Sequence, residues 1–476
     1  MLSSIKNYTV FCRLLILAVL TTGAVLQAED WLRFRGPNGA GISAVSITDK
    51  PSFEDSLIWK TDLPAGHSSP IVAGPRVYVT AVEDEKLFTL ALDRSSGKIL
   101  WRRQAPRPRV SQLQEFNNAA SSTPASDGEN VYVFFGDFGL LSYGPDGNER
   151  WRIPLGPFRT IRGMAASPIV VGGTLYMTCD ADGGDSFLIA ADAETGRELW
   201  RVDRSQFRRS FSTPAIYRPV DGLAELIVPG AFTMTSYAIE SGRELWRVNG
   251  LCWQPKAVPL IANGLVYLNC QGAGTDPNAG RYPDFSQALE TFDASGDGFL
   301  SLKEFYPEKA SRFPDLDLSQ DGLMDEEEWD YFRARMSTRP GFFAVRLGGR
   351  GDITDSHREW TLDRPMGNVP TPLLPDGVLY SVRNGGILAS VDAKTGEIVK
   401  RARLPQALGT YFGSPVAAGG KLYMVSAEGV LTVVRAQADW EVLHTLNLGD
   451  GSHTTPAIAD GRLYVRTFGH LYCFGK

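Results

Sequence analysis

The sequence contains little cysteine, no long apolar run after its first residues and no strong excess of charge of either sign. Lys and Arg number 48 against 54 Asp and Glu in 476 residues, so the formal net charge is −6. This balance excludes the basic footprint of a nucleic-acid-binding protein. No CxxCH motif is present, which excludes covalent attachment of a c-type haem.

Four of the five cysteines follow residue 28, namely Cys179, Cys252, Cys270 and Cys473. Cys179 and Cys270 each end a similar phrase, LYMTC and VYLNC, which places them on matching strands of different repeats. We interpret the four as free, buried thiols. Export of the chain would also permit a disulfide, so that alternative stays open.

The N-terminus combines Lys6 and Arg13 with an apolar run at 14–20 and small residues near Ala24 or Ala28. This pattern predicts a cleavable secretory signal over residues 1–28, too short to span a bilayer. The alternative is a membrane anchor. We therefore expect an exported protein, periplasmic or secreted, without a transmembrane segment after cleavage.

An internal repeat dominates the rest of the chain. A small or hydroxyl residue followed by proline occurs eight times, at Pro70, Pro124, Pro168, Pro214, Pro259, Pro372, Pro415 and Pro456. The spacings are 54, 44, 46, 45, 113, 43 and 41 residues, and each copy precedes a β-rich stretch such as RVYVT. Units of about 40–50 residues are typical of four-stranded propeller blades. The spacing of 113 is one blade plus an insertion.

A second phrase closes many of the repeats, as in LDRSSGKILW, ADAETGRELW and AIESGRELW. Its glycine supplies the positive φ of a hairpin turn, and its tryptophan can pack between neighbouring blades. The last repeat lacks this closing strand. The segment around Trp59 has the sequence features of such a strand, so we expect it to complete the last blade. The prediction is an all-β, eight-bladed β-propeller; seven blades is the alternative.

These phrases resemble the PQQ repeat, AxDxxTGxxxW, of quinoprotein dehydrogenases and of the outer-membrane assembly lipoprotein BamB. The opening DWLRFRGPNGAGIS is similar to the start of many exported bacterial members of this group. We divide the chain into a signal peptide (1–28), an N-terminal lead-in (29–58), a first part of the propeller (59–271), an insertion in the fifth blade (272–340) and a second part of the propeller (341–476).

The insertion contains two matches to the EF-hand loop, which places oxygen donors at positions 1, 3, 5, 7, 9 and 12 and glycine at position 6. The first loop supplies Asp293, Ser295, Asp297, the Phe299 carbonyl, Ser301 and Glu304. The second supplies Asp317, Ser319, Asp321, the Leu323 carbonyl, Asp325 and Glu328. This donor set predicts two Ca²⁺ sites in a small α-helical EF-hand pair. An acidic loop that has lost the metal is the alternative.

The two loops begin 24 residues apart, a shorter offset than in typical EF-hand sensors. The segment 304–313 must serve both loops, and Pro307 and Pro314 limit its length. Leu300 and Met324 stand at position 8, where a short β-bridge joins paired loops. Serine at position 3 of both loops predicts modest affinity. We expect a compact pair built for stability, and chelation should lower its melting temperature.

Residues that precede the proline phrases should converge on the mouth of the propeller channel. We predict a ligand pocket there, formed by His67, Arg209, Trp253, Lys256, Tyr411 and His453, with Asn117, Asn118, Arg162, Met164, Phe211, Asn368 and Phe412 at comparable positions. The alternative is that these side chains only plug the channel. The insertion should lie on the same face and overhang the mouth near His67, Trp253 and His453.

The leading hypothesis for function is an exported, calcium-binding, non-catalytic and monomeric scaffold for another protein or a polymer of the cell envelope. The alternative, implied by the resemblance, is a pyrroloquinoline quinone (PQQ)-dependent dehydrogenase of alcohols or sugars. Those enzymes use a catalytic Asp and often a disulfide between adjacent cysteines, and neither can be matched here. PQQ therefore has no specific residues in its favour. A carbohydrate-binding or hydrolytic propeller is a third possibility.

Overall fold

The structure, a computed structural model, describes residues 29–111, 113–270, 276, 278, 280–338, 341–364 and 366–475. The predicted signal peptide lies outside the described residues. Within them, no helix is long and apolar enough to cross a membrane.

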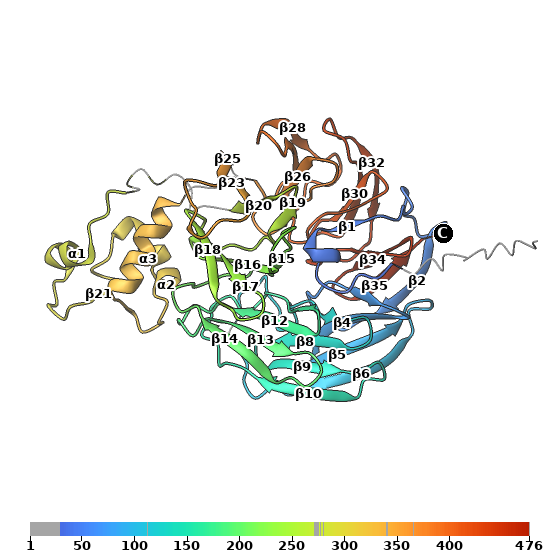
Figure 1. The fold of residues 1–476 in the computed structure, drawn as a ribbon, viewed down its shortest axis with the longest axis horizontal. Helices are drawn as coiled ribbons and strands as arrows, with labels where there is room; N and C mark the ends of the chain where they lie inside the picture. Colours follow the sequence, from blue (N-terminus) through green and yellow to red (C-terminus); the bar gives the residue numbers. More distant parts are fainter. Residues whose placement is uncertain are drawn as a thin grey trace, which may run out of the picture.

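Eight sheets stand in a closed ring around a central axis (Figure 1). The first four blades follow one another along the chain. Blade 1 contains β3 (Ile71–Ala73), β4 (Arg76–Glu83), β5 (Lys86–Asp93) and β6 (Ile99–Ala105). Blade 2 contains β7 (Ala125–Ser126), β8 (Val131–Phe135), β9 (Gly139–Tyr143) and β10 (Glu149–Pro154). Blade 3 contains β11 (Ile169–Val171), β12 (Thr174–Cys179), β13 (Phe187–Asp192) and β14 (Glu198–Asp203), and blade 4 contains β15 (Ala215–Tyr217), β16 (Glu225–Gly230), β17 (Thr233–Ala238) and β18 (Glu244–Asn249).

The remaining four blades close the ring. Blade 5 contains β19 (Leu260–Ala262), β20 (Leu265–Cys270), β23 (Gly341–Arg346) and β25 (Arg358–Leu362). Blade 6 contains β26 (Val378–Arg383), β27 (Ile387–Asp392) and β28 (Ile398–Arg403), with Leu373 bridged to Tyr380 at its inner edge. Blade 7 contains β29 (Val416–Ala418), β30 (Lys421–Val425), β31 (Val430–Arg435) and β32 (Val442–Asn447), and blade 8 contains β33 (Ala457–Ala459), β34 (Arg462–Arg466) and β35 (His470–Phe474).

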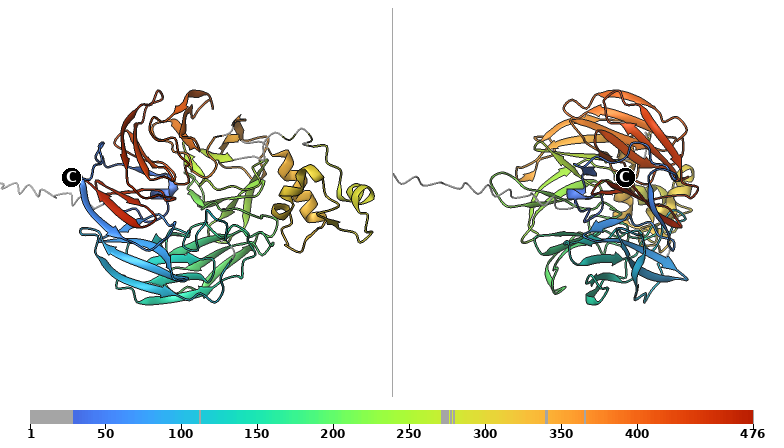
Figure 2. Two further views of the ribbon diagram at one scale, coloured as in Figure 1. Left: turned by 180° about the vertical axis from the view of Figure 1, so that it is seen from behind. Right: turned by 90° about the vertical axis from the view of Figure 1, so that its right-hand side faces the viewer.

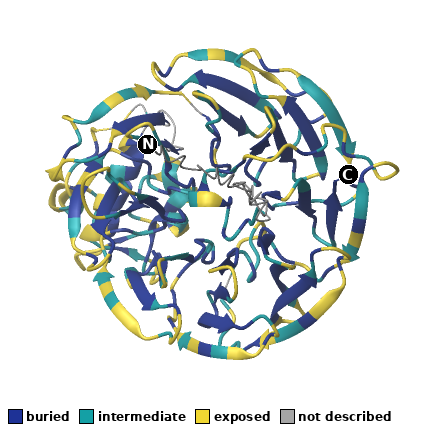
Figure 3. Cartoon of the chain, turned by 45° about the vertical axis from the view of Figure 1, so that its right-hand side comes forward, coloured by how far each residue is buried: buried dark blue, intermediate teal, exposed yellow. Residues whose placement is uncertain are grey.

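The first and last parts of the propeller share one sheet. Strand β2 (Leu57–Asp62) pairs antiparallel with β35, with Trp59 opposite Cys473. Blade 8 therefore has four strands in the order β2-β35-β34-β33, as the sequence predicted. Eight blades are confirmed, and this closure leaves no unpaired edge between the two ends of the ring. Figure 3 shows the resulting circular outline, in which much of each blade is buried and exposed residues lie toward the outer strands.

In five blades the repeat tryptophan joins the blade to the next one. Trp151 on β10 donates its indole N–H to the Ala193 carbonyl of blade 3 at 3.0 Å, and its ring lies against Gly196 in the same hairpin. A Cβ on Gly196 would lie 2.7 Å from the ring, and the residue has φ of +74°. The same ring-to-glycine contact joins Trp59 to Gly97, Trp101 to Gly147, Trp200 to Gly242 and Trp360 to Gly396. The Thr-Gly…Trp repeat thus encodes an interface between blades as well as a turn.

The insertion lies between β20 and β23, the second and third strands of blade 5. Its elements are α1 (Phe285–Phe292), β21 (Leu300–Ser301), the 3₁₀ helix η2 (Pro307–Arg312), α2 (Phe313–Leu316), β22 (Leu323–Met324) and α3 (Glu326–Ser337). It has its own apolar core, which includes Phe305, Phe313, Trp329 and Phe332. Figures 1 and 2 show it projecting from one side of the ring. The segment between the two acidic loops contains only η2 and α2, in keeping with Pro307 and Pro314.

The contact between tryptophan and glycine predicts a measurable difference between two glycines of blade 3. We expect Gly196→Ala to lower the free energy of unfolding by about 2–4 kcal/mol, because backbone strain adds to overpacking against Trp151. Gly173→Ala is the matched control, since Gly173 has φ of +77° and open space around its Cβ position. This substitution should lower the free energy of unfolding only by the backbone strain, about 1–2 kcal/mol. Urea unfolding followed by tryptophan fluorescence measures both, and equal losses would contradict the packing argument.

Candidate functional site

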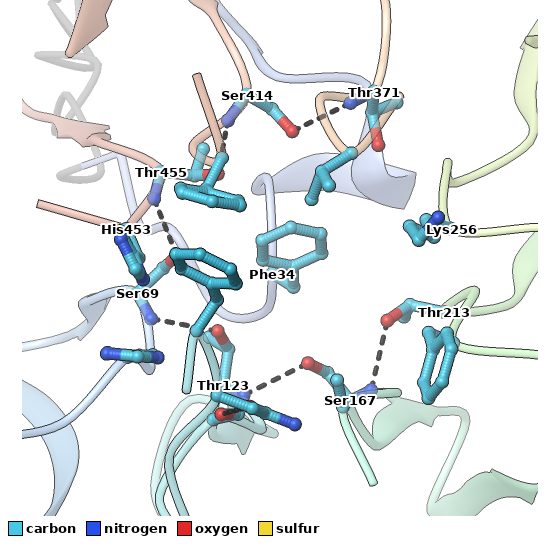
Figure 4. A pocket seen from close by; sticks show the side chains of 18 of the residues that line it. Phe34, Ser69, Thr123, Ser167, Thr213, Lys256, Thr371, Ser414, His453 and Thr455 are labelled. Atoms are coloured by element: carbon cyan, nitrogen blue, oxygen red, sulfur yellow. Dashed lines mark hydrogen bonds between the residues drawn. The ribbon is translucent and has the colours of Figure 1, made fainter. Parts of the chain in front are cut away.

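A ring of hydroxyl groups lines the channel at the residue before each repeat proline. Seven of these eight residues are Ser or Thr, namely Ser69, Thr123, Ser167, Thr213, Thr371, Ser414 and Thr455. Each hydroxyl oxygen accepts a hydrogen bond from the backbone N–H at the equivalent position of the preceding blade, at 2.9–3.0 Å. Figure 4 shows most of this chain of bonds as dashed lines around the pocket. The ring satisfies backbone donors that would otherwise be buried without partners.

The ring has one gap, at the fifth blade. Val258 occupies the hydroxyl position there, so Thr213 faces a side chain that cannot accept a hydrogen bond. Val258 donates its own N–H to Thr371 in the normal way, at 3.0 Å. Lys256, two residues earlier, lies between Thr213 and Thr371 in the same part of the pocket (Figure 4). The blade that lacks the hydroxyl therefore contributes a cation instead.

The N-terminal lead-in closes the channel on one side of this ring. Arg33 donates to the Pro214 carbonyl at 2.6 Å, and Arg35 donates to the carbonyls of Pro372 and Pro415, both at 2.8 Å. Both guanidinium groups are buried, and burial lowers the pKa of each to about 9. Phe34, between them in sequence, lines the pocket and occupies its centre in Figure 4.

The lead-in is itself fastened to several blades. Trp31 forms a bridge with Val72, and β1 (Ile42–Ser43) runs parallel to β29. Asn38 exchanges two hydrogen bonds with the backbone of Ile216. The N-terminal lead-in is therefore a structural plug that ties blades 1, 4 and 7 together.

Above Phe34 lies a cavity of about 240 Å³. Its aromatic walls are Phe34, Phe116, Phe211 and Phe412, and its polar lining consists of the seven ring hydroxyls with His67, Gln114, Asn117, Ser121, Arg162, Lys256 and His453. None of its described lining residues is Asp or Glu. A concave, largely aromatic cavity with a few converging polar groups is the usual form of a small-molecule site, although this one is below the common range of about 300–1,000 Å³.

The two histidines of the pocket stack with each other and with phenylalanine. The rings of His67 and His453 lie 4.6 Å apart, and His453 also lies 4.2 Å from Phe412 and 5.0 Å from Phe468. Burial, helped by His453 and Arg466, lowers the pKa of His67 to about 3, and burial also lowers the pKa of His453. Both imidazoles are therefore neutral at neutral pH and add no charge to the pocket.

Lys256 is a cation that faces this pocket without a carboxylate partner among the described residues. Its ammonium donates to the side-chain oxygen of Asn368 at 2.9 Å. Burial lowers the pKa of Lys256 to about 8, and the charge of Arg162 acts in the same direction. The other cation of the lining, Arg162, is already bonded to Gln114 at 2.6 Å and to Asp315.

The six predicted pocket residues divide into two groups. His67, Lys256 and His453 line the cavity, as do Asn117, Arg162, Phe211 and Phe412 from comparable positions. Arg209, Trp253 and Tyr411 lie outside its lining. Arg209 is buried against Asp182, at 2.6 Å, and Tyr411 donates its hydroxyl to the Ala407 carbonyl at 3.0 Å. Trp253 lies under the guanidinium of Arg335, 3.8 Å from the centre of its ring system.

Sequence reasoning missed two parts of the pocket. The hydroxyl residues were recognised only as a signature of the repeat, although their recurrence before every proline but one was the available signal. Phe34 was part of the recognised opening phrase, but nothing in that phrase shows that the lead-in crosses the channel. The four described cysteines are free and buried, in keeping with their sequence interpretation.

The two acidic loops have the same internal geometry. In the first, Asp293 accepts from the backbone N–H groups of Gly296 and Gly298 at 2.7 and 3.0 Å, while Glu304 accepts from those of Ser295 and Ser301, both at 3.0 Å. In the second, Asp317 accepts from Gly322 at 2.9 Å, and Glu328 accepts from Ser319 and Asp325 at 2.7 and 3.3 Å. The first and last acidic residues of each loop therefore turn toward the same loop backbone.

The two loops also pair with each other. Strands β21 and β22 are antiparallel, with Leu300 opposite Met324. Gly298 and Gly322 have φ of +82° and +86°, which are the turns expected at position 6. The described residues contain no group of three or more His, Cys, Asp and Glu side chains arranged to hold a metal ion. The predicted donor sets also draw on serine hydroxyls and backbone carbonyls, which such a group does not include.

Two carboxylates attach the insertion to the propeller, Asp315 and Glu327, and Glu327 of α3 pairs with Arg208 at 2.5 Å. Asp315, two residues before the second loop, pairs with Arg335 of α3 at 2.7 Å, with Arg209 at 3.0 Å and with Arg162. Although burial raises it, the pKa of Asp315 is brought below its ordinary value by Arg209, Arg335 and Arg162. A further contact joins Tyr331 of α3 edge-on to Phe232, with ring centres 5.5 Å apart. We call Asp315 and its three arginines the Asp315 cluster.

The position of the insertion agrees with the prediction only in part. It emerges from the predicted loop, and Arg335 covers Trp253. The described contacts of the two channel histidines are instead with each other and with Phe412 and Phe468. Asp315 pairs with Arg162, which lines the cavity, so the insertion reaches the channel mouth near Trp253. An overhang above His67 and His453 stays a prediction.

Fold and repeat together define an eight-bladed β-propeller of the PQQ-repeat type. The family model described as outer membrane protein assembly factor BamB matches residues 52–179, 91–250 and 352–472, well over half of the chain. The chain belongs to this family. The curated BamB of Burkholderia pseudomallei (strain K96243) is 26% identical over 187 residues, which are 38% of this chain and 41% of the relative. The alignment thus spans about two fifths of that relative.

Solved structures show the same fold at low identity. BamB from Moraxella catarrhalis aligns with a TM-score of 0.56 and 11% identity over 88% of this chain and 97% of its own. A europium-containing methanol dehydrogenase aligns with a TM-score of 0.58 and 12% identity, over 94% of this chain and 98% of its own. Quinohemoprotein alcohol dehydrogenase from Comamonas testosteroni aligns with a TM-score of 0.59 and 12% identity, over 94% of this chain and 80% of its own. At these identities the similarity establishes the fold alone.

The hydroxyl ring predicts a specific loss of stability. We expect Thr371→Val to lower the free energy of unfolding by about 1–3 kcal/mol, because the buried N–H of Val258 loses its acceptor. Thr371→Ser keeps the oxygen and should cost at most about 1 kcal/mol for the lost methyl group. Chemical unfolding of both variants measures the difference. Equal losses would show that the hydrogen bond contributes nothing.

Proposed function

We propose that this protein is an exported, non-catalytic scaffold that binds another protein or a polymer of the cell envelope, with a calcium-stabilised EF-hand pair attached to its propeller. The observation that carries the proposal is the Asp315 cluster, in which Asp315 of the insertion pairs with Arg162 and Arg209 of the propeller. A rigid surface that spans both parts suits a binding protein, because little conformational freedom is lost on association. The family name, outer membrane protein assembly factor, favours a partner of this kind.

Calcium binding in the insertion is supported by several independent features of the loops. Oxygen donors occur at all six required positions in both, the glycines have positive φ, and Leu300 bridges Met324. Hard oxygen donors at this spacing suit Ca²⁺ rather than the smaller Mg²⁺. The residues that would hold the two ions are the twelve named from the sequence. The ion would stabilise the fold and would take no part in chemistry.

Quinone-dependent oxidation is the second candidate, and the fold similarity to two alcohol-oxidising enzymes is the observation in its favour. The channel pocket does not fit that chemistry. Its described lining offers no carboxylate to accept a proton from an alcohol or to hold a calcium ion beside a quinone. Addition of PQQ and calcium, followed by reduction of a dye acceptor with alcohols and sugars, tests this directly. Reproducible oxidation would overturn the scaffold proposal.

The calcium proposal predicts two binding events by calorimetry and a higher melting temperature of the insertion in calcium than in chelator. At a hundredfold excess over the dissociation constant, each site should add about 2.7 kcal/mol. Glu304→Gln and Glu328→Gln should each remove one event, because each removes the acidic donor at position 12. Glu290→Gln is the matched control on the exposed face of α1. Flat calorimetry together with identical melting in calcium and chelator would refute calcium binding.

The scaffold proposal predicts capture of a defined envelope component by the immobilised chain. The same component should be lost or weakened at least severalfold with the variant Asp315→Asn, because the insertion then loses its ion pairs with Arg162 and Arg209. Asp330→Asn is the control, since Asp330 is exposed and pairs only within α3. Purified partner and chain should then bind in a two-component assay. Failure of that assay for every captured component would contradict the scaffold role.

A further inference from the structure

The channel pocket contains hydrogen-bond donors that the fold itself does not use. Each of the seven ring hydroxyls accepts an N–H bond, which leaves its own O–H free to donate. Within the described part of the chain, none of these seven O–H groups has an acceptor, although all seven residues are at least nine-tenths buried. A hydroxyl that already accepts a hydrogen bond is a stronger donor, because hydrogen bonds in a chain polarise one another. The ring therefore presents donors to whatever enters the pocket.

The charged side chains of the pocket also favour a negatively charged ligand. Lys256 and Arg162 bring positive charge, the two histidines are neutral, and the described lining contains no Asp or Glu. Arg162 is occupied by Asp315 and Gln114, whereas Lys256 has only the neutral Asn368 as a hydrogen-bond acceptor among the described residues. An anion is thus the ligand for which the ammonium of Lys256 is placed. Such a charge-assisted bond is stronger than one between neutral groups.

The remaining walls limit the size and nature of this anion. Four phenylalanines face the cavity, and the lead-in closes one side of it behind Phe34. A volume of about 240 Å³ is at the small end for a ligand site. The site therefore suits a compact molecule with one apolar ring and one acidic group.

We propose that the channel pocket binds a small aromatic carboxylate, with its acidic group on Lys256 and the hydroxyls of Thr213 and Thr371, and its ring among the phenylalanines. These three residues lie together at the gap in the hydroxyl ring, where Val258 replaces the eighth hydroxyl (Figure 4). The site differs from the calcium loops and does not depend on any protein partner. It needs no redox chemistry, so it also stands apart from the quinone alternative.

The first test uses the unmodified full-length chain. Benzoate and phenylacetate should bind by calorimetry and by saturation-transfer NMR, while the uncharged benzamide and phenylacetamide should bind at least tenfold more weakly. Equal binding of acid and amide, or no binding of either acid, would overturn the proposal. PQQ is included as a separate arm. Binding of the quinone without binding of either simple acid would also overturn it.

The second test removes the cation. Lys256→Met keeps the alkyl chain and should weaken phenylacetate at least tenfold. Lys86→Met is the matched control, because Lys86 is exposed on a distant hairpin, and it should leave binding unchanged. Circular dichroism melting shows whether both variants fold. If Lys256→Met binds phenylacetate as well as the native chain does, the assignment is wrong.

The third test probes the hydroxyls and the pH dependence. Thr213→Val should weaken phenylacetate severalfold, and the native Val258 shows that the ring accepts valine at this kind of position. Binding should also weaken above pH 8, because Lys256 then loses its proton while the ligand stays ionised. The charged and titratable groups around Lys256 are Arg162, Asp315, Cys252 and Cys270. Affinity that stays constant from pH 7 to 10 would contradict a role for this ammonium.

Discussion

The structure depends on how a propeller satisfies the backbone at its narrow end. Each innermost strand starts after a proline, and the residue before that proline must place its N–H toward the next blade. A hydroxyl at the same position of that blade accepts the bond, so one residue type repeated around the channel satisfies seven buried donors and links neighbouring blades. An unpaired buried N–H costs about 1–3 kcal/mol, so the ring is a strong constraint on these positions. The lead-in also joins the blades here, because Arg33 and Arg35 donate hydrogen bonds to carbonyl groups of the repeat prolines.

At the outer rim of the propeller, neighbouring blades are joined by a contact between an aromatic ring and a glycine. In five blades the indole of the closing strand lies on the glycine of the next hairpin, where no Cβ would fit. The glycine is thus required twice, once by its positive φ and once by the neighbouring tryptophan. Blades 4, 6 and 7 depart from this pattern. Trp246 of blade 4 donates its indole N–H to Glu225 of its own blade at 2.8 Å. VDAKTGEIVK has no tryptophan, and Trp440 lies beside Lys400 instead, with the ammonium 4.7 Å from its ring centre.

The insertion shows how a second unit can be added without disturbing this frame. It leaves from the hairpin between β20 and β23, far from the repeat tryptophans, and brings its own aromatic core. Asp315 and Glu327 supply the electrostatic attachment. One partly buried carboxylate that faces three guanidinium groups is strongly held in its charged form, so this contact is directional as well as strong. Because Arg162 also lines the channel pocket, the Asp315 cluster and the pocket share one residue.

The sequence by itself determined the number of blades, the strand that closes the ring and the place of the insertion, because proline, glycine and tryptophan constrain the backbone locally at fixed spacing. Its account of the pocket was partial. His67, Lys256 and His453 reach the cavity, whereas Arg209 and Tyr411 are turned into buried contacts. Only the tertiary structure decided this, since each of these residues precedes a repeat proline and only the packing of adjacent blades sets its direction. The lead-in that closes the channel and the hydroxyl ring that lines it likewise depend on residues hundreds of positions apart in sequence.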